Sequence, residues 1–277
     1  AMVSDRVTVS HRVNAERLVL LGWSRAILLQ FAHPLIAAGI ADHSGFRDQP
    51  LAAVQRLRQT VRAMLDLTFG SPAESERTLE RIRTIHGRVN GQLPVEAGPF
   101  AAGTPYSAEE PDLVLWVHAT LVESVPMFYE MLIGPLASAE RDAYCVEAAP
   151  LAVALNARPD AVPSSWAALQ AYLDRMYASG QIVVSAQARE LAAAVLSPPL
   201  GPIGVPGTAM NRLLTVGTLP PGVRSQYGFR WTRNRERAFD AVVRTLRTSR
   251  RPLPDRLAKW KAARRLERRA GAAVTLR

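Results

Sequence analysis

The chain has 277 residues, of which 48% are hydrophobic and 21% are charged, and it contains a single cysteine, Cys145. This composition is typical of a folded protein with a sizeable core and excludes an intrinsically disordered chain. One cysteine excludes an internal disulfide framework and suits a reducing compartment. No basic segment followed by an apolar one, as in a signal peptide, is found near the start, and we expect a cytoplasmic protein.

The net charge of +10 is concentrated toward the C-terminus. Residues 230–277 hold 16 Lys and Arg against 4 Asp and Glu, whereas residues 1–229 hold 18 against 20. We expect an all-α domain over 1–229 and a basic helical extension over 230–277 that packs on it or trails from it. The alternation of Arg with Ala, Leu and Asp fits a solvated helix. A weak contact with an anionic membrane surface is the alternative, and no specific nucleic-acid binding is expected.

Helical periodicity dominates the N-terminal half of the chain. A first helix is expected to begin at Asn14 as its cap and to end near Pro34, because a proline disfavours the helical conformation of the preceding residue. Ser71 then caps a helix with Pro72 at its first position and Gly91 at its end.

The same periodicity continues to the basic extension, and no convincing run of alternating strand residues interrupts it. Residues 200–207, rich in proline and glycine, are the expected internal joint. A single all-α domain is therefore the predicted fold class. Further helices are expected at 50–69, 107–132 with a bend at Pro126, 136–156, 163–179, 185–197, 206–216 and 232–248.

The longest apolar stretch, residues 18–41, is interrupted by Arg25, Gln30 and His33. A membrane-spanning helix needs about twenty apolar residues with few or no charges. The sequence therefore predicts no membrane span here.

Two histidines on consecutive predicted helices continue apolar stripes at spacings of three and four residues. Both imidazoles are expected to point into the core. Each is either a neutral, hydrogen-bonded core histidine or part of a metal or cofactor site, and the nearby stretch 32–50 adds two more histidines. The stripes consist of Leu79, Ile82, His86 and Val89, and of Val114, His118, Leu121 and Val125.

The sequence lacks the motifs of several metal sites. It contains no Glu-x-x-His for a di-iron bundle and no His-Glu-x-x-His for a zinc enzyme. Its one cysteine is too few for a structural zinc site, and no Cys-x-x-Cys-His is present for covalent haem. A haem held without covalent attachment by one neutral histidine stays open.

The segment RLRQT, residues 56–60, places Arg56 and Thr60 four positions apart on one helix face. Both lie at the edge of an apolar face, where a side chain can reach into a pocket. A haem site for oxygen chemistry needs a cation or hydrogen-bond donor near the metal and cations for the propionates. Without further support, an exposed Arg beside a neutral Thr is the simpler interpretation.

Five segments resemble, in order, the family of haem oxygenases typified by the rubber-cleaving latex clearing protein and the MpaB oxygenase of mycophenolic acid biosynthesis. The resemblance extends over nearly the whole chain. It implies an all-α domain with a globin-like core, a non-covalent haem b, and oxidation of an apolar small-molecule substrate by dioxygen. The segments are AHPLIAAGIADHSGFRDQP, RLRQT, IHGRVNG, WVHATLVES and TLPPGVRSQYGF.

The resemblance also implies roles for the cofactor-binding candidates. His86 would be the ligand of the haem iron, and His118 would lie near the haem from the next helix. Arg56 and Thr60 would face the distal or propionate side, as both binding and catalytic residues. His33 would lie in the wall of the haem pocket that residues 32–50 form.

Two further points follow from this resemblance. Asp42 and His43 lie near the place where the rubber-cleaving enzymes carry an acidic residue proposed as a base, and either one is the candidate here. The lysine that can close the sixth coordination position in those enzymes is replaced by Gln59. The resting iron is then expected to be five-coordinate or water-ligated, which weakens any transfer of the polyisoprene-cleaving activity.

A second class of function stays open beside the oxygenase. A non-catalytic protein that binds haem or another apolar ligand, with the basic extension docking on a partner or membrane surface, has the same sequence features. Because the five segments end before Arg230, we expect the extension to be dispensable for the haem site in either case.

Overall fold

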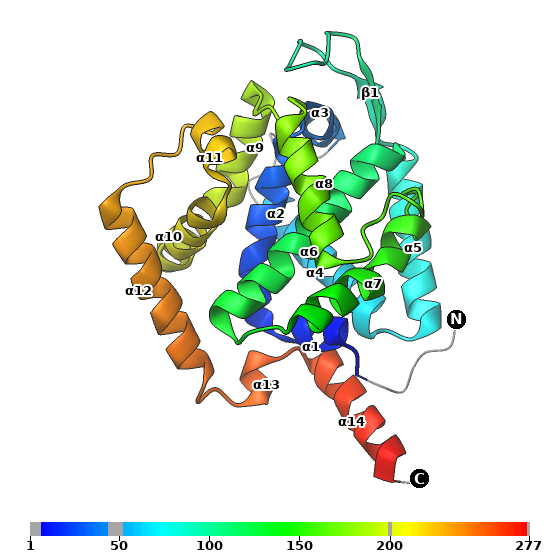
Figure 1. Cartoon of the computed structure of the whole chain (residues 1–277), viewed down its shortest axis with the longest axis vertical. Coiled ribbons are helices and arrows are strands. Elements are labelled where there is room, and N and C mark those ends of the chain that lie inside the picture. Colours follow the sequence, from blue (N-terminus) through cyan, green and yellow to red (C-terminus); the bar gives the residue numbers. More distant parts are fainter. Residues whose placement is uncertain (1–6, 44–51, 199–200, 276–277) are drawn as a thin grey trace.

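Two apolar helices, α2 (Leu21–Phe31) and α6 (Pro111–Leu132), pack against each other at the centre of the computed structural model, which describes residues 7–43, 52–198 and 201–275 (Figure 1). Gly22 permits the close approach, because a Cβ at this position would lie 2.9 Å from the Ser124 carbonyl oxygen and 3.0 Å from the Phe128 ring. The buried Trp116 indole donates a hydrogen bond to the Leu29 carbonyl oxygen at 3.1 Å. These contacts make the α2–α6 pair the core of the fold.

The described residues confirm the predicted all-α fold class. The one sheet in this part of the chain has two short strands, and a globin-like arrangement of the helices stays a prediction. The other elements are α1 (Val9–Ala15), the 3-10 helix η1 (Arg17–Leu20), α3 (Pro34–His43), α4 (Ala52–Phe69), α5 (Pro72–His86), β1 (Asn90–Gln92), β2 (Pro105–Ser107), α7 (Ser138–Ala154), α8 (Trp166–Ala178), α9 (Ala186–Leu196), α10 (Gly201–Thr218), α11 (Pro221–Gln226), α12 (Arg233–Arg250), α13 (Asp255–Ala258) and α14 (Lys261–Thr275).

The polar residues within the apolar stretch of α2 have partners inside the molecule. Arg25 is 2% exposed, and its guanidinium donates to the Glu123 carboxylate at 2.7 Å and to the Ser124 hydroxyl at 2.6 Å. The Gln30 amide donates to the Thr120 hydroxyl at 3.1 Å. Among the described residues, no single helix is long and apolar enough to cross a membrane; only residues 17–31 and 34–43 together meet the criteria, across a bend of 106°.

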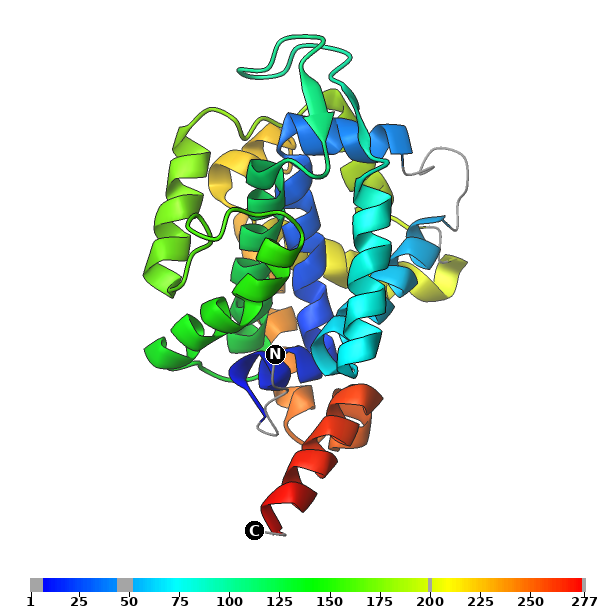
Figure 2. The same ribbon diagram turned by 90° about the vertical axis from the view of Figure 1, so that its right-hand side faces the viewer.

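Helices α4 and α5 form an antiparallel hairpin whose cap agrees with the sequence. Ser71 and Glu74 exchange the hydrogen bonds of a capping box, and Pro72 occupies the first helical position. Figure 2 shows α5 in cyan, with the two-stranded sheet beyond its C-terminal end. The helix ends at His86 instead of the predicted Gly91, because β1 begins at Asn90.

Residues 34–43 of the stretch expected to form a haem pocket wall make a regular helix, α3. Pro34 ends one helix and begins the next, since its fixed φ suits a first helical turn. The helix packs on the sheet through Gly39, where a Cβ would contact Tyr106 and Val89 at 3.4 Å. The antiparallel pairing of β1 with β2 was not predicted. Residues 44–51 lie outside the described part of the chain.

Two further sequence predictions are wrong. Asn14 is not a cap; its side chain donates to the Ser10 carbonyl oxygen at 2.9 Å inside α1, which begins after the N-cap Thr8. The expected joint at 200–207 lies almost wholly in α10, which starts at residue 201.

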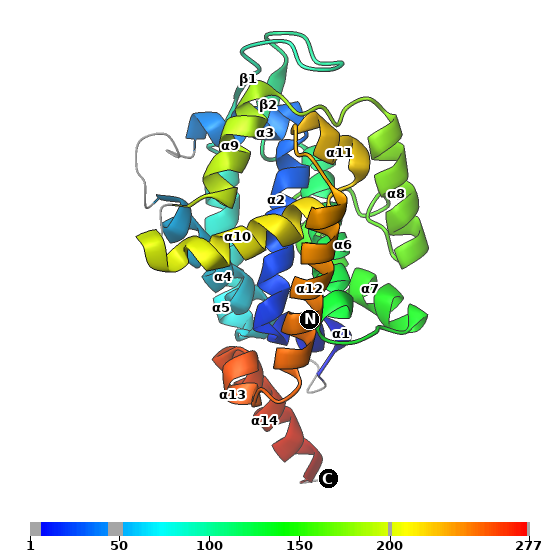
Figure 3. The same cartoon turned by 90° about the vertical axis from the view of Figure 1, so that its left-hand side faces the viewer.

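Helix α12 packs on α10 and α6. Figure 3 shows α12 in orange beside α10 in yellow. Its apolar residues Phe239, Val242 and Leu246 join a buried cluster around Phe128. The arginines along its other face, such as Arg244, are exposed. The helix therefore has the solvated basic face that its sequence pattern indicates.

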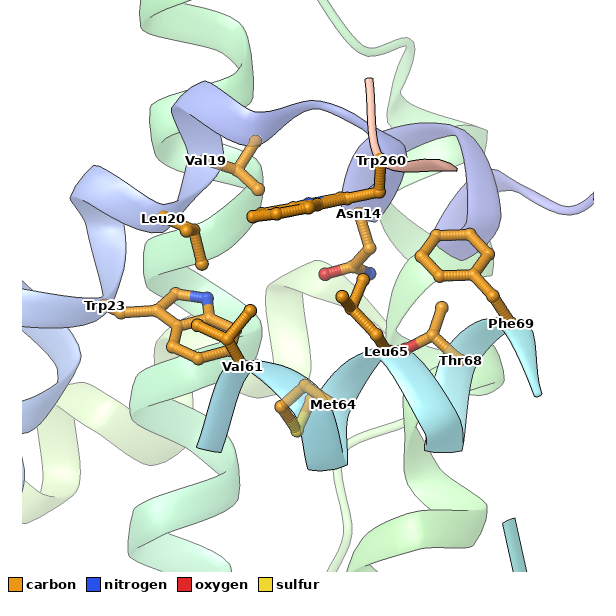
Figure 4. A pocket seen from close by; sticks show the side chains of 10 residues that line it. All are labelled: Asn14, Val19, Leu20, Trp23, Val61, Met64, Leu65, Thr68, Phe69 and Trp260. Atoms are coloured by element: carbon orange, nitrogen blue, oxygen red, sulfur yellow. The ribbon is translucent and has the colours of Figure 1, made fainter. Parts of the chain in front are cut away.

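Residues 250–260, here called the C-terminal strap, tie the chain's end to its beginning. Arg250 forms an ion pair with Glu16, and the Trp260 backbone NH donates to the Ala15 carbonyl oxygen at 3.0 Å. The Trp260 indole closes a void of about 20 Å³, and Figure 4 shows it facing Leu65 of α4. Beyond the strap, α14 contacts α4 and α1, and its end projects from the body (Figure 1).

Candidate functional site

His86 lies in the last turn of α5, and its side chain is half-buried. Burial lowers the pKa of the His86 imidazole below its ordinary value, while the nearby Glu109 carboxylate acts in the opposite direction. The imidazole is therefore neutral at pH 7, which is the form that binds a metal. It has no hydrogen-bond partner among the described residues. No pattern in the sequence indicated a role for Glu109.

His118 lies on α6 and is also half-buried. Burial alone lowers the pKa of His118 to about 4, so this imidazole is neutral as well. It too lacks a hydrogen-bond partner within the described part of the chain. Because both rings are half-buried, their nitrogens can be solvated, and the structure is compatible with a neutral core-facing histidine as well as with a ligand.

The apolar neighbours of the two histidines are incompletely covered. Leu79 and Ile82 on α5 and Leu121 on α6 are only half-buried, and none of them belongs to a cluster of the hydrophobic core. In the described structure, α5 makes its main helix contacts with α4. The two faces thus offer apolar surface and a neutral imidazole each, which suits an apolar group held by one histidine.

The residue that follows α5 lies close to the residues that precede α6. A Cβ on Gly87 would lie 3.5 Å from the Glu109 carboxylate, just before α6 begins. The Arg83 side chain donates to the Ala154 carbonyl oxygen at 2.9 Å, which ties the same end to α7. The position of His86 is therefore supported from two neighbouring helices.

The antiparallel pairing of α4 with α5 brings Arg56 of α4 to about the same height along the helix pair as His86 of α5. Thr78 of α5 lies beside Asp66 of α4, with 3.5 Å between the Thr78 hydroxyl and the Asp66 carboxylate. At 1.5 Å per residue, Arg56 lies about 15 Å from Asp66 along α4, and His86 lies about 12 Å from Thr78 along α5 in the same direction. The orientation of the Arg56 side chain is outside what the structure describes. Thr60 is exposed.

Asp42 and His43, at the end of α3, are held by the segment that follows His86. The Tyr106 hydroxyl donates to the Asp42 carboxylate at 2.5 Å, and His43 Nε2 lies 3.0 Å from the Asn90 carbonyl oxygen. Both residues are exposed at this edge. The structure thus brings the end of α3 to the β1–β2 sheet, which follows α5. It also shows Tyr106 as a partner of Asp42 that the sequence did not predict.

His33 has different surroundings from His86 and His118. Its ring is 2% exposed, and its centroid lies 5.2 Å from that of Phe100. It lines a cavity of about 660 Å³, and the residues around this cavity include neither His86 nor His118. The expected place of His33 in a haem pocket wall stays a prediction.

His86 and the apolar residues near it suit a haem better than a bare metal ion. In the described part of the chain, no three His, Cys, Asp or Glu side chains gather as a metal-ligand set. A haem needs one axial histidine and apolar surface for its porphyrin. His86, with the half-buried apolar residues around it, provides both.

Comparison with known proteins places these residues in a wider context. A family model described as the catalytic domain of the ER-bound oxygenase mpaB/B′ and rubber oxygenase matches residues 11–248, a span that contains every candidate residue. The uncharacterized proteins Rv2237 of Mycobacterium tuberculosis (strain ATCC 25618 / H37Rv) and Mb2261 of Mycobacterium bovis (strain ATCC BAA-935 / AF2122/97) are each 27% identical over 237 residues, covering 83% of this chain and 88% of the relative. No solved structure gives a significant match.

Proposed function

The chain belongs to the family of the MpaB and rubber oxygenase catalytic domains, and on that basis we propose that it is a haem b-dependent oxygenase acting on an apolar small molecule. Family membership makes it an oxygenase-type domain; the haem and the substrate class are the proposal. The observation that supports the haem most is the pair of neutral, half-buried imidazoles, His86 and His118, beside half-buried apolar residues that belong to no core cluster of the described residues.

His86 is the proposed axial ligand. Its imidazole is neutral, so no proton has to leave before it binds a metal. The Glu109 carboxylate nearby favours positive charge on the ring and would make the ligand more electron-donating. Haem b, when bound, supplies the binding and activation of dioxygen.

The remaining candidates act around that ligand. His118 presents a neutral ring from α6 to orient the cofactor or to contact its edge. Arg56, at the level of His86 on α4, supplies a positive charge for a propionate or for the oxygen side. Gln59 and Thr60, both exposed, are hydrogen-bonding groups on the same helix, and Gln59 cannot supply an amine ligand.

Hemin titration of the purified full-length protein tests the proposal. We expect one equivalent of hemin to give a Soret band, acid–acetone to extract the pigment, and the pyridine haemochrome spectrum to be that of haem b. A protein that stays colourless and takes up no hemin would rule the haem out. Oxygen consumption by the reduced, haem-loaded protein with a panel of apolar compounds then separates an oxygenase from a non-catalytic haem protein.

A further inference from the structure

The cavity beside His33 is a second site, distinct from the residues proposed to hold haem. Its volume of about 660 Å³ lies within the range of small-molecule pockets. Its walls come from α3, the segment from β1 to β2, α6 and α8. No group of the proposed haem site except the wall residue His33 contributes to it.

The inner wall is mostly apolar, with one polar group that lacks a partner. Leu35, Phe100, Leu113 and Tyr172 supply apolar and aromatic surface. Among them, His33 is 2% exposed; a hydrogen bond with Gln181 of the lining raises the pKa of its ring, against the larger effect of burial, while its Nδ1 is buried without a partner among the described residues. An unmade hydrogen bond of a buried polar group costs about 1–3 kcal/mol. A bound molecule that hydrogen-bonds the imidazole would offset part of that cost.

The charges around the cavity give no net attraction for an anion. Arg158 is already paired with Asp112 at 2.8 Å. The other charged residues of the lining are Glu110, Asp160 and Arg175, all exposed, so the carboxylates are in excess by one. A ligand with two carboxylates, such as haem, is therefore a poor match, and an uncharged molecule suits the site.

One wall of the cavity belongs to a contact that also fixes a candidate catalytic residue. The Tyr106 side chain lines the cavity, and its hydroxyl donates to the Asp42 carboxylate at the end of α3. The two-stranded sheet that carries Tyr106 is the next element after α5, which ends at His86. A molecule in the cavity therefore lies one side chain away from Asp42.

We infer that this cavity binds an uncharged, largely apolar organic molecule that forms a hydrogen bond with His33. This binding site does not rest on the function proposed above.

Prodan, a neutral naphthalene ketone whose emission shifts to the blue in apolar surroundings, is a suitable probe for the full-length protein. We expect wild type to bind it saturably at one site. Ala161→Trp fills the cavity and should weaken binding at least tenfold, whereas the matched control Ala171→Trp, on the exposed face of α8 outside the cavity, should not change it. His33→Phe keeps a ring against Phe100 and should weaken binding about fivefold, with an unchanged or higher Tm.

Three results would overturn the site: no prodan binding by wild type, equal binding by Ala161→Trp, or displacement of prodan by one equivalent of hemin. The haem proposal fails separately. If the protein shows the expected prodan pattern and takes up no hemin, the cavity site stands and the haem proposal is ruled out.

Discussion

Both carboxylate oxygens of Glu16 accept hydrogen bonds from Arg250, at 2.6 and 2.7 Å, although the two residues are 234 positions apart in the chain. Their side chains are only 4% and 15% exposed. Removing one member of a buried ion pair leaves the other charge uncompensated. We expect Arg250→Ala to lower the free energy of unfolding by about 3 kcal/mol in urea denaturation. The exposed neighbour Arg247→Ala should change it by less than about 0.5 kcal/mol, and equal effects would contradict this prediction.

The position of Trp260 bears on the stability and hemin uptake of a chain shortened at its C-terminus. Its indole faces Leu65 of α4, the helix that also carries Arg56 and Thr60, and this contact predicts that the extension contributes to the haem site. Ending the chain at Ser249 removes both Trp260 and Arg250, and we expect a lower Tm together with reduced hemin uptake. A chain ending after Trp260 keeps both contacts and serves as the control. If the shorter chain binds hemin as wild type does, the original expectation of dispensability holds.

The crossing of α2 and α6 depends on a glycine. Gly22→Ala would place a methyl group 2.9 Å from the Ser124 carbonyl oxygen, where neither helix backbone can move freely. We expect a loss of about 1–3 kcal/mol in the free energy of unfolding, in spite of the better helix propensity of alanine. Gly222→Ala, whose Cβ would have no neighbour within 4 Å, is the matched control. A stability gain in both variants would show that the helices adjust to the methyl group.

Acid sensitivity follows from the buried histidines. Burial lowers the pKa of His33 from 6.5 to about 4, so between these pH values the unfolded chain binds a proton that the folded chain does not. The free energy of unfolding therefore falls as the pH drops from about 6.5 to 4, by up to about 3 kcal/mol for this residue, and levels off below 4. His33→Phe should remove that part of the pH dependence in urea titrations, while His118 still contributes in the same direction. An unchanged slope would contradict the prediction.

The two haem-site histidines should differ in their effects. His86→Ala removes the proposed ligand and should leave little haem bound, as measured by the Soret absorbance per protein. His118→Ala should keep most of the haem, with a shifted spectrum, because it removes a contact beside the ligand. Arg56→Ala should keep haem and lower turnover about 100-fold if its charge acts on the oxygen side. A fully loaded His86→Ala with an unchanged Soret band would show that the ligand assignment is wrong.

Local signals explain which parts of the fold were predictable. The cap of α5 was correct in detail because Ser71, Pro72 and Glu74 specify a helix start without help from distant residues. The cap of α1 was missed because the residue three positions after Thr8 is His11, whose ring takes the place that Glu or Gln usually has. α3 was missed because Pro34 was interpreted only as a stop, although it also suits the first turn of a helix.

In the candidate site too, local sequence patterns predicted some features and missed those that depend on distant residues. The spacing on α5 and α6 correctly predicted that His86 and His118 share faces with apolar residues, although both are half-buried instead of fully buried. The contact of Tyr106 with Asp42 joins residues 64 positions apart, and strands of three residues are too short for an alternating pattern. No local pattern in the sequence specifies such a contact.

The C-terminal strap has a consequence for the order of events during synthesis. Glu16 leaves the ribosome 234 residues before its partner Arg250, and Ala15 likewise emerges long before its partner Trp260. Contacts between such distant residues form late, because they close a loop of nearly the whole chain. Until then, Leu65 on α4 lacks the indole that covers it. Under the proposed function, we therefore expect haem to be captured beside this helix only after the strap has formed.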